Sequence, residues 1–257
     1  MADGVQRSAI ITGASLGIGR AIALRLAADG AGVMLVGREE SALQAVRDEI
    51  RSQDGSADYI VVSLEDRAAA AAIVARALDR FGRLDILVNC ASATINDDIF
   101  TVTDDQWAQG FEVKVFAALR LCRAAWPALK EAGGAVVNIG GIGARTPRAD
   151  GTMTGALSAA LMAISKSLAE RGIAEGVQVN MINPGFIRTP RSEGLLARAL
   201  GTDDVDEAAR IGAANLGATR PGRPEDVAAL VAFILSPGGD YLQGAIIDLD
   251  GGATRGI

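Results

Sequence analysis

The chain has 257 residues, 49% of them hydrophobic, and its 25 Lys and Arg against 31 Asp and Glu give a net charge of −6. This composition supplies enough apolar surface for a sizeable core and excludes a globally disordered chain. An acidic chain also lacks the positive surface of nucleic-acid-binding proteins, so we expect no nucleic-acid partner. Because there is no histidine, a Ser-His-Asp triad and a histidine-ligated metal are excluded, and we expect no metal site.

The cysteines and the apolar runs indicate the cellular compartment of the protein. Two cysteines, Cys90 and Cys122, are too few for a disulfide framework, which favours a reducing compartment. No apolar run is long enough to cross a membrane, and residues 1–8 contain Asp3 and lack the apolar core of a signal peptide. We therefore expect a cytoplasmic protein with no membrane partner.

Short apolar runs typical of strands recur along the chain, at residues 9–11, 33–36, 59–62, 86–88, 135–137, 177–179 and 245–247. They do not alternate polar with apolar residues, which is typical of parallel strands buried on both faces. Between them the apolar spacing becomes that of helices, as at Leu157, Leu161, Ile164 and Leu168. This alternation predicts an α/β fold, a doubly wound parallel sheet of the Rossmann type.

No repeat or linker divides the chain, so we expect one domain over residues 1–257. The least regular part is residues 189–224, which contain Pro190, Pro221 and Pro224. We expect this segment to be a mobile cover on the substrate side, over the ends of the strands.

A glycine-rich turn follows the first predicted strand and precedes a helix. It reads Thr12-Gly13-Ala14-Ser15-Leu16-Gly17-Ile18-Gly19. Glycines allow close approach of backbone N–H groups to a phosphate, and the helix N-terminus adds partial positive charge. The turn therefore predicts a dinucleotide site that includes Gly13, Ser15, Gly17, Ile18 and Gly19, although a turn without a ligand would have the same composition.

At this point the sequence resembles the short-chain dehydrogenase/reductase family. The spacing Gly13-xxx-Gly17-x-Gly19 is that family's fingerprint, and further similar motifs occur at Asp85–Asn89, Asn183-Pro184-Gly185, Arg220–Asp226 and Asp250-Gly251-Gly252. The resemblance covers nearly the whole chain. It implies a nicotinamide cofactor and a homo-oligomer, either a tetramer or a dimer.

The end of the second predicted strand bears on the choice of cofactor. A carboxylate there would bind the ribose hydroxyls of NAD, but this chain has Gly37 followed by Arg38. Arg38 can pair with the 2′-phosphate of NADP, with Ser15 adding a hydroxyl, so we expect NADP(H) to be favoured over NAD(H). The alternative is that Arg38 is a solvated surface arginine.

The resemblance assigns further cofactor-binding positions after later strands, namely Ser63, Asn89, Ala91, Pro184, Gly185, Ile187 and Thr189. Two positions depart from the family pattern. Ser63 stands where members usually carry an adenine-binding Asp, and Ser92 replaces a glycine that lets the cofactor's ribose approach the backbone. We therefore expect weaker or shifted cofactor binding.

The proton-handling positions depart further. In the family a Ser, a Tyr and a Lys carry the proton chemistry, and an Asn on the preceding helix supports a water relay. The resemblance places Gly141, Thr154, Ser158 and Lys114, respectively, at these four positions. The sequence therefore predicts a non-standard active site that does not perform ordinary Tyr-Lys alcohol or ketone redox.

Thr154 cannot replace a tyrosine, because an aliphatic hydroxyl stays protonated at neutral pH and is a poor proton donor. Lys114 follows Val113 in an apolar helix, and its amine could occupy the place of the lost lysine beside the small Ser158. A buried ammonium there would act as an acid or as an electrostatic clamp. The alternative is a structural lysine paired with Glu112 or with a partner subunit.

Polar residues on loops after the fourth, fifth and sixth strands are substrate-site candidates: Thr94, Asn96, Asp97, Asp98, Arg145, Arg148, Asp150, Arg188 and Arg191. Several arginines facing one cleft would hold an anionic small molecule, although most arginines are surface charges. Any of the aspartates is a candidate carboxylate base.

Three functions remain open on the sequence. The first is an NADP(H)-binding oxidoreductase with a rebuilt proton-transfer site. The second is a catalytically silent family member that acts as a subunit or binding protein. The third is non-redox lyase or hydratase chemistry in the same cleft.

Overall fold

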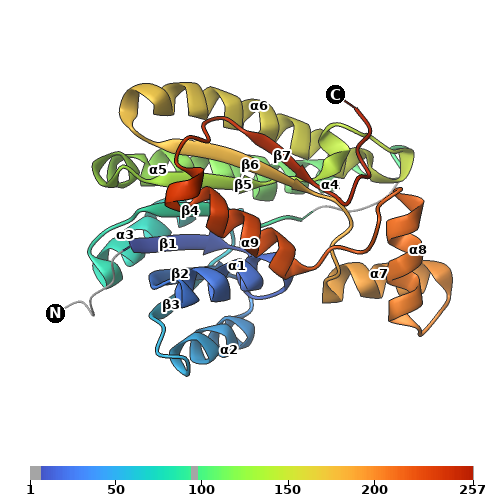
Figure 1. The fold of residues 1–257 in the computed structure, drawn as a ribbon, viewed down its shortest axis with the longest axis horizontal. Coiled ribbons are helices and arrows are strands. Elements are labelled where there is room, and N and C mark those ends of the chain that lie inside the picture. The colour runs from blue at the N-terminus through green and yellow to red at the C-terminus, as the bar shows by residue number, and fades with distance from the viewer. Residues whose placement is uncertain (1–6, 94–97, 257) are drawn as a thin grey trace.

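A computed structural model describes residues 7–93 and 98–256 and shows one sheet of parallel strands between two layers of helices (Figure 1). The sheet has seven strands in the order β3-β2-β1-β4-β5-β6-β7. Their bounds are β1 Arg7–Thr12, β2 Ala31–Gly37, β3 Ala57–Val61, β4 Ile86–Asn89, β5 Ala135–Ile139, β6 Gln178–Pro184 and β7 Ile246–Leu249. The predicted Rossmann-type fold is confirmed.

The helices are α1 Gly17–Ala28, α2 Glu40–Arg51, α3 Ala69–Phe81, α4 Asp104–Phe111, α5 Ala117–Ala132, α6 Thr152–Glu175, α7 Pro190–Leu200, α8 Val205–Asn215 and α9 Pro224–Ile234. A π-helical turn, Glu112–Phe116, joins α4 to α5. Short 3₁₀ turns lie at Ile142–Ala144, Ala149–Gly151 and Pro237–Gly239.

Each central strand is buried on both faces. Ile11 of β1 packs into a core with α1, α2 and α9, whereas its neighbour Ile10 packs into a second core with α3, α5 and α6. Both side chains are fully buried. This two-sided burial explains why the strands are recognisable as unbroken apolar runs.

The strand order reverses beside β1. The chain runs outward from β1 through β2 and β3 and then returns to place β4 on the other side of β1. Crevices at such reversals, at the carboxyl ends of the strands, are where open α/β sheets bind ligands. The glycine turn after β1 and the segment after β4 therefore border the expected cofactor crevice.

The segment 189–224 is more regular than its prolines suggest. It contains α7 and α8, which lie at the lower right of Figure 1, away from the helices that cover the sheet. Pro190 and Pro224 are the first residues of α7 and α9, where a missing N–H costs no hydrogen bond. The mobility of this segment stays a prediction.

Within residues 7–93 and 98–256, the helices are too short or too polar for one of them to cross a bilayer.

We predict that Gly19→Ala destabilises the fold. A Cβ on Gly19 would lie 2.2 Å from the Gly13 carbonyl oxygen, so α1 would have to move away from the turn. We expect a loss of about 1–3 kcal/mol in the free energy of unfolding, although alanine usually stabilises a helix. Urea unfolding measures it, with Gly151→Ala as the matched control, because a Cβ there meets open space. Equal midpoints for the two variants would refute the close contact.

Candidate functional site

The glycine turn lies between the ends of β2 and β4. Gly13 has a positive φ of 66°, and a Cβ there would lie 3.1 Å from the Cα of Ala91, the second residue after β4. On the other side, the Ala14 N–H donates to the Val36 carbonyl of β2 over 3.2 Å. Only a residue without a side chain gives the backbone this approach.

The N-terminus of α1 is open to an anion. Its N-cap is Leu16, which has no polar side-chain atom to cap the first N–H groups and is 60% exposed. Gly17, the first helical residue, has a φ of 55°. Uncapped N–H groups next to glycines suit phosphate oxygens, so these residues fit the pyrophosphate of a dinucleotide.

Thr12 fixes the segment after β4 against this turn. Its Oγ1 accepts hydrogen bonds from the N–H groups of Cys90 over 2.9 Å and Ala91 over 3.0 Å. Asn89 is buried, and its Nδ2 donates to Oδ1 of Asn138 on β5 over 2.8 Å. The Asn89 side chain therefore links β4 to β5, and the residues after it reach the crevice through their backbone.

The residues expected to select the cofactor lie at the ends of β2 and β3. The Val62 N–H donates to the Gly37 carbonyl over 2.9 Å, which keeps the two strand ends adjacent. Arg38 and Ser63 are not buried. Arg38 forms no ion pair with any described residue, so its guanidinium remains able to meet a phosphate.

The loop that follows β6 reaches the glycine turn. Thr189 lies against it, because a Cβ on Gly17 would be 3.0 Å from the Thr189 Cγ2. Ile187 is buried and pairs with Gly222. Gly185 is equally tight, since a Cβ there would lie 2.8 Å from the Cα of Asp250. Thr189 thus borders the same crevice, at the end of a closely packed segment.

The positions that the resemblance assigns to the family's Ser, Tyr and Lys converge in space. A Cβ on Gly141, after β5, would lie 3.5 Å from the Oγ of Ser158 and 3.8 Å from the Cγ2 of Thr154. Thr154 and Ser158 are one turn apart on α6. Ser158 is fully buried, and its Oγ has no hydrogen-bond partner among the described residues. We call these three positions, together with Lys114, the chemical cluster.

Lys114 reaches the same place from the π-helical turn. Its Nζ donates to the carbonyl of Gly140 over 3.3 Å, next to Gly141, and only 4% of the residue is exposed. Burial lowers the pKa of Lys114 from 10.5 to about 8. The expected alternative pairing with Glu112 is wrong, because Glu112 forms its ion pair with Arg120 over 2.6 Å.

Cys90 and the two tyrosines are poor candidates for the proton chemistry of the chemical cluster. Burial raises the pKa of the Cys90 thiol to about 12, and the nearby Lys114 offsets this only in part. The hydroxyl of Tyr59 donates to Glu40 of α2, and Tyr241 is 99% exposed near the C-terminal strand. Among the described residues of the chemical cluster, Lys114 is therefore the candidate proton donor, because its pKa of about 8 lies close to neutral pH.

A series of hydrogen bonds that the sequence did not predict holds the backbone of Gly141. The Gly141 N–H donates to Oδ1 of Asn183 over 3.3 Å, and the Asn183 Nδ2 donates to Asp248 over 3.0 Å. Asp248 in turn pairs with Arg145 over 3.1 Å. In the sequence, the one feature that pointed to this series of hydrogen bonds was Asp248, an aspartate inside the apolar last strand.

Among the described residues, the substrate candidates do not gather in one pocket. Arg148 pairs with Asp150 over 3.0 Å at the surface, and this contact lowers the pKa of Asp150, which makes it a weaker base. The carboxylate of Asp98 accepts the N–H of Phe100. Thr94, Asn96, Asp97 and the side chain of Arg191 lie outside the described residues.

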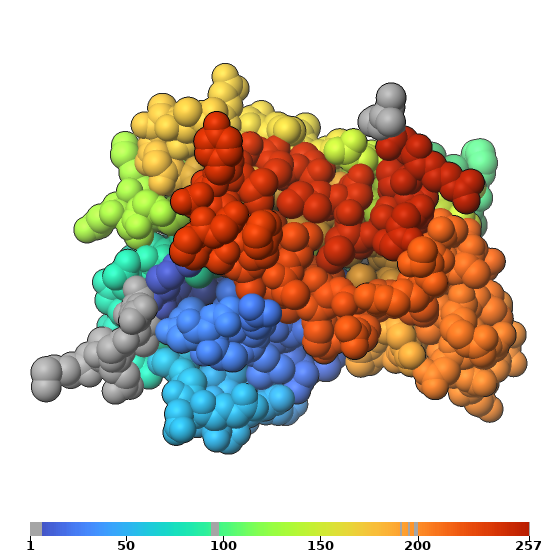
Figure 2. Space-filling view, viewed as in Figure 1, coloured from blue at the N-terminus to red at the C-terminus, as the bar shows by residue number. Residues whose placement is uncertain are grey.

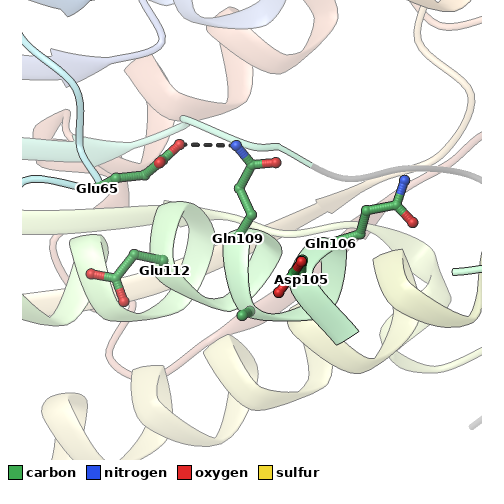
Figure 3. A pocket seen from close by; sticks show the side chains of 6 residues that line it. Glu65, Asp105, Gln106, Gln109 and Glu112 are labelled. Carbon is green, nitrogen blue, oxygen red and sulfur yellow. Dashed lines mark hydrogen bonds between the residues drawn. The ribbon is translucent and has the colours of Figure 1, made fainter. Parts of the chain in front are cut away.

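A shallow hollow of about 500 Å³ lies beside α4 (Figure 3). It is lined by Glu65, Asp105, Gln106, Ala108, Gln109 and Glu112. Figure 3 shows Gln109 donating to Glu65, over 3.1 Å, across this acidic surface. It contains none of the residues of the chemical cluster and suits no phosphate.

Known proteins share this sequence pattern and this geometry. Residues 13–254 match the family model described as enoyl-(acyl carrier protein) reductase. The short-chain reductase NovJ of Streptomyces niveus is 35% identical over 95% of this chain and 92% of its own length. The 3-oxoacyl-[acyl-carrier-protein] reductase FabG of Escherichia coli is 32% identical over 95% and 96%, respectively.

The chain belongs to the short-chain dehydrogenase/reductase family. Among solved structures, L-sorbose reductase from Gluconobacter frateurii, in complex with NADPH and L-sorbose, is similar at a TM-score of 0.93 and 31% identity, with both chains fully covered. An actinorhodin polyketide ketoreductase with NADPH is similar at a TM-score of 0.91 and 26% identity, again over both whole chains. The predicted family is confirmed.

We predict that Lys114 makes stability depend on pH. Between pH 8 and pH 10.5 the folded chain has lost a proton that the unfolded chain still holds, so the free energy of unfolding rises with pH in this window. Relative to Lys114→Met, the wild-type protein should gain on the order of 3 kcal/mol across it. Urea unfolding at several pH values measures the difference. Parallel profiles for the two proteins would contradict a depressed pKa.

Proposed function

We propose that this protein is an NADP(H)-dependent reductase of carbonyl compounds, in which Lys114 takes over the proton delivery that other family members assign to Tyr and Lys. The single observation that carries this proposal is the position of the Lys114 amine, hydrogen-bonded beside Gly141. The amine donates to the carbonyl of Gly140. The next residue, Gly141, is the one that lies near both Thr154 and Ser158.

The cofactor part of the proposal rests on the crevice and on the relatives. Gly13, Gly17, Ile18 and Gly19 would hold the pyrophosphate, and Arg38 with Ser15 would meet the 2′-phosphate. Ser63 would lie near the adenine. Several solved relatives contain NADPH, and this supports the choice of NADP(H) over NAD(H).

The remaining contacts would fall on the nicotinamide half. The backbone of Asn89 and Ala91 would border its ribose, and Pro184, Gly185, Ile187 and Thr189 would border the carboxamide and phosphates. When bound, NADPH supplies the hydride that reduces a carbonyl carbon.

The chain's own task is to deliver a proton to the oxygen that becomes an alcohol. A pKa of about 8 leaves Lys114 largely protonated at neutral pH and able to release its proton. Its ammonium also supplies positive charge in a buried place, which stabilises a developing alkoxide. Ser158 and Gly141 leave room for this by being small, and the Thr154 side chain contacts the same place without acting as an acid.

For the substrate, the partners and the location of the protein, we propose only general classes. The relatives include reductases of 3-oxoacyl groups on a carrier protein and of L-sorbose, which supports a carbonyl substrate. An anionic substrate stays a hypothesis. We further propose a cytoplasmic homo-oligomer, a tetramer or a dimer, and the 47% exposure of Phe116 on the π-helical turn supports an apolar contact there.

A second candidate function is a catalytically silent subunit or binding protein. The observation that favours it is that Gly141, Thr154 and Ser158 converge without bringing a general acid to that place. Lyase or hydratase chemistry in the same cleft is the remaining alternative. Turnover measurements separate these candidates from the reductase.

We predict that Arg38 selects the cofactor. Arg38→Asp should weaken NADPH binding by about 10- to 100-fold and leave NADH binding similar or tighter, because a carboxylate repels the 2′-phosphate and accepts ribose hydroxyls. Fluorescence titration of both cofactors measures this. The matched control is Arg25→Asp on α1, an exposed arginine remote from the strand ends. Equal losses for NADPH and NADH would remove Arg38 from cofactor selection.

We predict that Lys114→Met lowers turnover by about 100-fold or more while the dissociation constant for NADPH changes by less than about threefold, because general acid catalysis contributes about 10²–10⁴. Wild-type kcat/KM should fall as pH rises above about 8, as Lys114 loses its proton. NADPH oxidation is followed with panels of carbonyl and enoyl substrates, and exposed Lys130→Met is the control. Unchanged turnover in Lys114→Met would remove this residue from the mechanism.

Binding of NADPH without turnover on either panel would favour the silent or non-redox candidates. Absence of NADPH binding would overturn the cofactor assignment itself.

A further inference from the structure

An arginine-lined hollow shares no lining residue with the glycine turn or the chemical cluster. It has a volume of about 570 Å³, and its lining residues are Arg188, Asp206, Arg210, Arg220, Pro221 and Arg223. Ligand pockets usually fall between about 300 and 1,000 Å³. Four arginines and one carboxylate form this lining, and three carboxylates just outside it, Glu193, Glu207 and Asp226, pair with these arginines.

The backbone builds one wall of this arginine hollow rigidly. The Arg188 N–H donates to the Gly222 carbonyl over 2.8 Å, and the Gly222 N–H donates to the Phe186 carbonyl over 2.9 Å. A Cβ on Gly222 would lie 2.5 Å from the Cδ1 of Ile187, so the two segments are in direct contact. Arg188 is therefore held beside Arg220 and Arg223.

The opposite wall is α8. Asp206 and Arg210 are four residues apart on this helix and share a face. In Figure 2 the surface of α8 continues into the segment that leads to α9 on the viewed face. A ligand in the arginine hollow would therefore contact both α8 and the body of the domain.

The carboxylates around the hollow leave donors unused. Asp226 is shared by Arg220 over 2.8 Å and Arg223 over 3.4 Å, and the bond from Arg220 contributes most to lowering its pKa to about 2. Among the described residues, Arg210 pairs only with Glu207 of its own helix turn. Each guanidinium has five N–H donors, so these pairs leave several free.

Two carboxylates, Glu193 and Asp206, compete with a ligand for Arg188, and Glu193 pairs with it over 2.7 Å. The carboxylate of Asp206 pairs with Arg188 over 2.6 Å, although 75% of the Asp206 side chain is exposed. Exposed ion pairs of this kind contribute little to stability, so an anion with more charge can displace Asp206.

We propose that the arginine hollow binds a phosphate group, held by Arg188, Arg220 and Arg223 on one wall and by Arg210 on α8. A phosphate offers up to two negative charges and several oxygens, which match clustered guanidinium groups better than a single carboxylate does. The proposal does not depend on redox chemistry. The site also adjoins the crevice, because Arg188 precedes Thr189, whose Cγ2 lies against Gly17.

The test is calorimetric titration of pyrophosphate and of coenzyme A into the full chain, with excess NADP⁺ present to fill the glycine turn. Arg210→Ala should weaken both probes by about fivefold or more, and Arg220→Ala/Arg223→Ala by about tenfold or more. Asp206→Asn should tighten both, because it removes one of the two competing carboxylates. The matched control is Arg25→Ala/Arg171→Ala, which removes two exposed arginines that also have carboxylate partners.

Arg210→Ala keeps the proposal testable if the double variant fails to fold, since the ion pair of Arg210 lies within α8. Tighter binding of coenzyme A than of pyrophosphate would identify the phosphate as part of a substrate carrier, and equal binding would identify a free anion. Equal affinities in the arginine variants and the control, or no binding of either probe, would overturn the proposal. If NADP⁺ itself fails to bind, the differences between these variants still decide it.

Discussion

Close packing of backbone on backbone at the crevice is the constraint on which the rest of this structure depends. The carbonyl of Gly13 touches α1 at Gly19, and the Cα of Ala91 lies against Gly13 from the other side. These contacts join β1, α1 and the end of β4 without intervening side chains. Because of them the N–H groups of α1 stay open at the carboxyl end of the sheet, where a phosphate can approach them.

The chemical cluster shows small side chains meeting within the frame of one strand end and one helix. Gly141, Thr154 and Ser158 still meet, because β5 and α6 keep the packing that brings them together. The buried Lys114 amine brings a titratable cation beside these residues, where it donates to the Gly140 carbonyl. Its desolvation, which is unfavourable for folding, is also what brings its pKa toward neutrality.

Much of the fold was predictable from the sequence, because two-sided burial makes each strand an unbroken apolar run. The convergence of the replaced positions was predictable from the motifs that flank them. The hydrogen bonds that link Gly141 through Asn183 to Asp248 could not be predicted. They depend on the register that places Asn183 opposite Asp248 in neighbouring strands. The helices of residues 189–224 were missed because Pro190 and Pro224 begin helices instead of interrupting them.

The π-helical turn Glu112–Phe116 indicates how such a site can arise. A π turn accommodates one residue more than an α-helical turn, so it changes the rotational phase of the helix that continues from it. Here α4 and α5 each keep their apolar sides against the body of the domain, while the wider turn between them aims Lys114 inward. The direction of one side chain is thereby uncoupled from the packing of two helices.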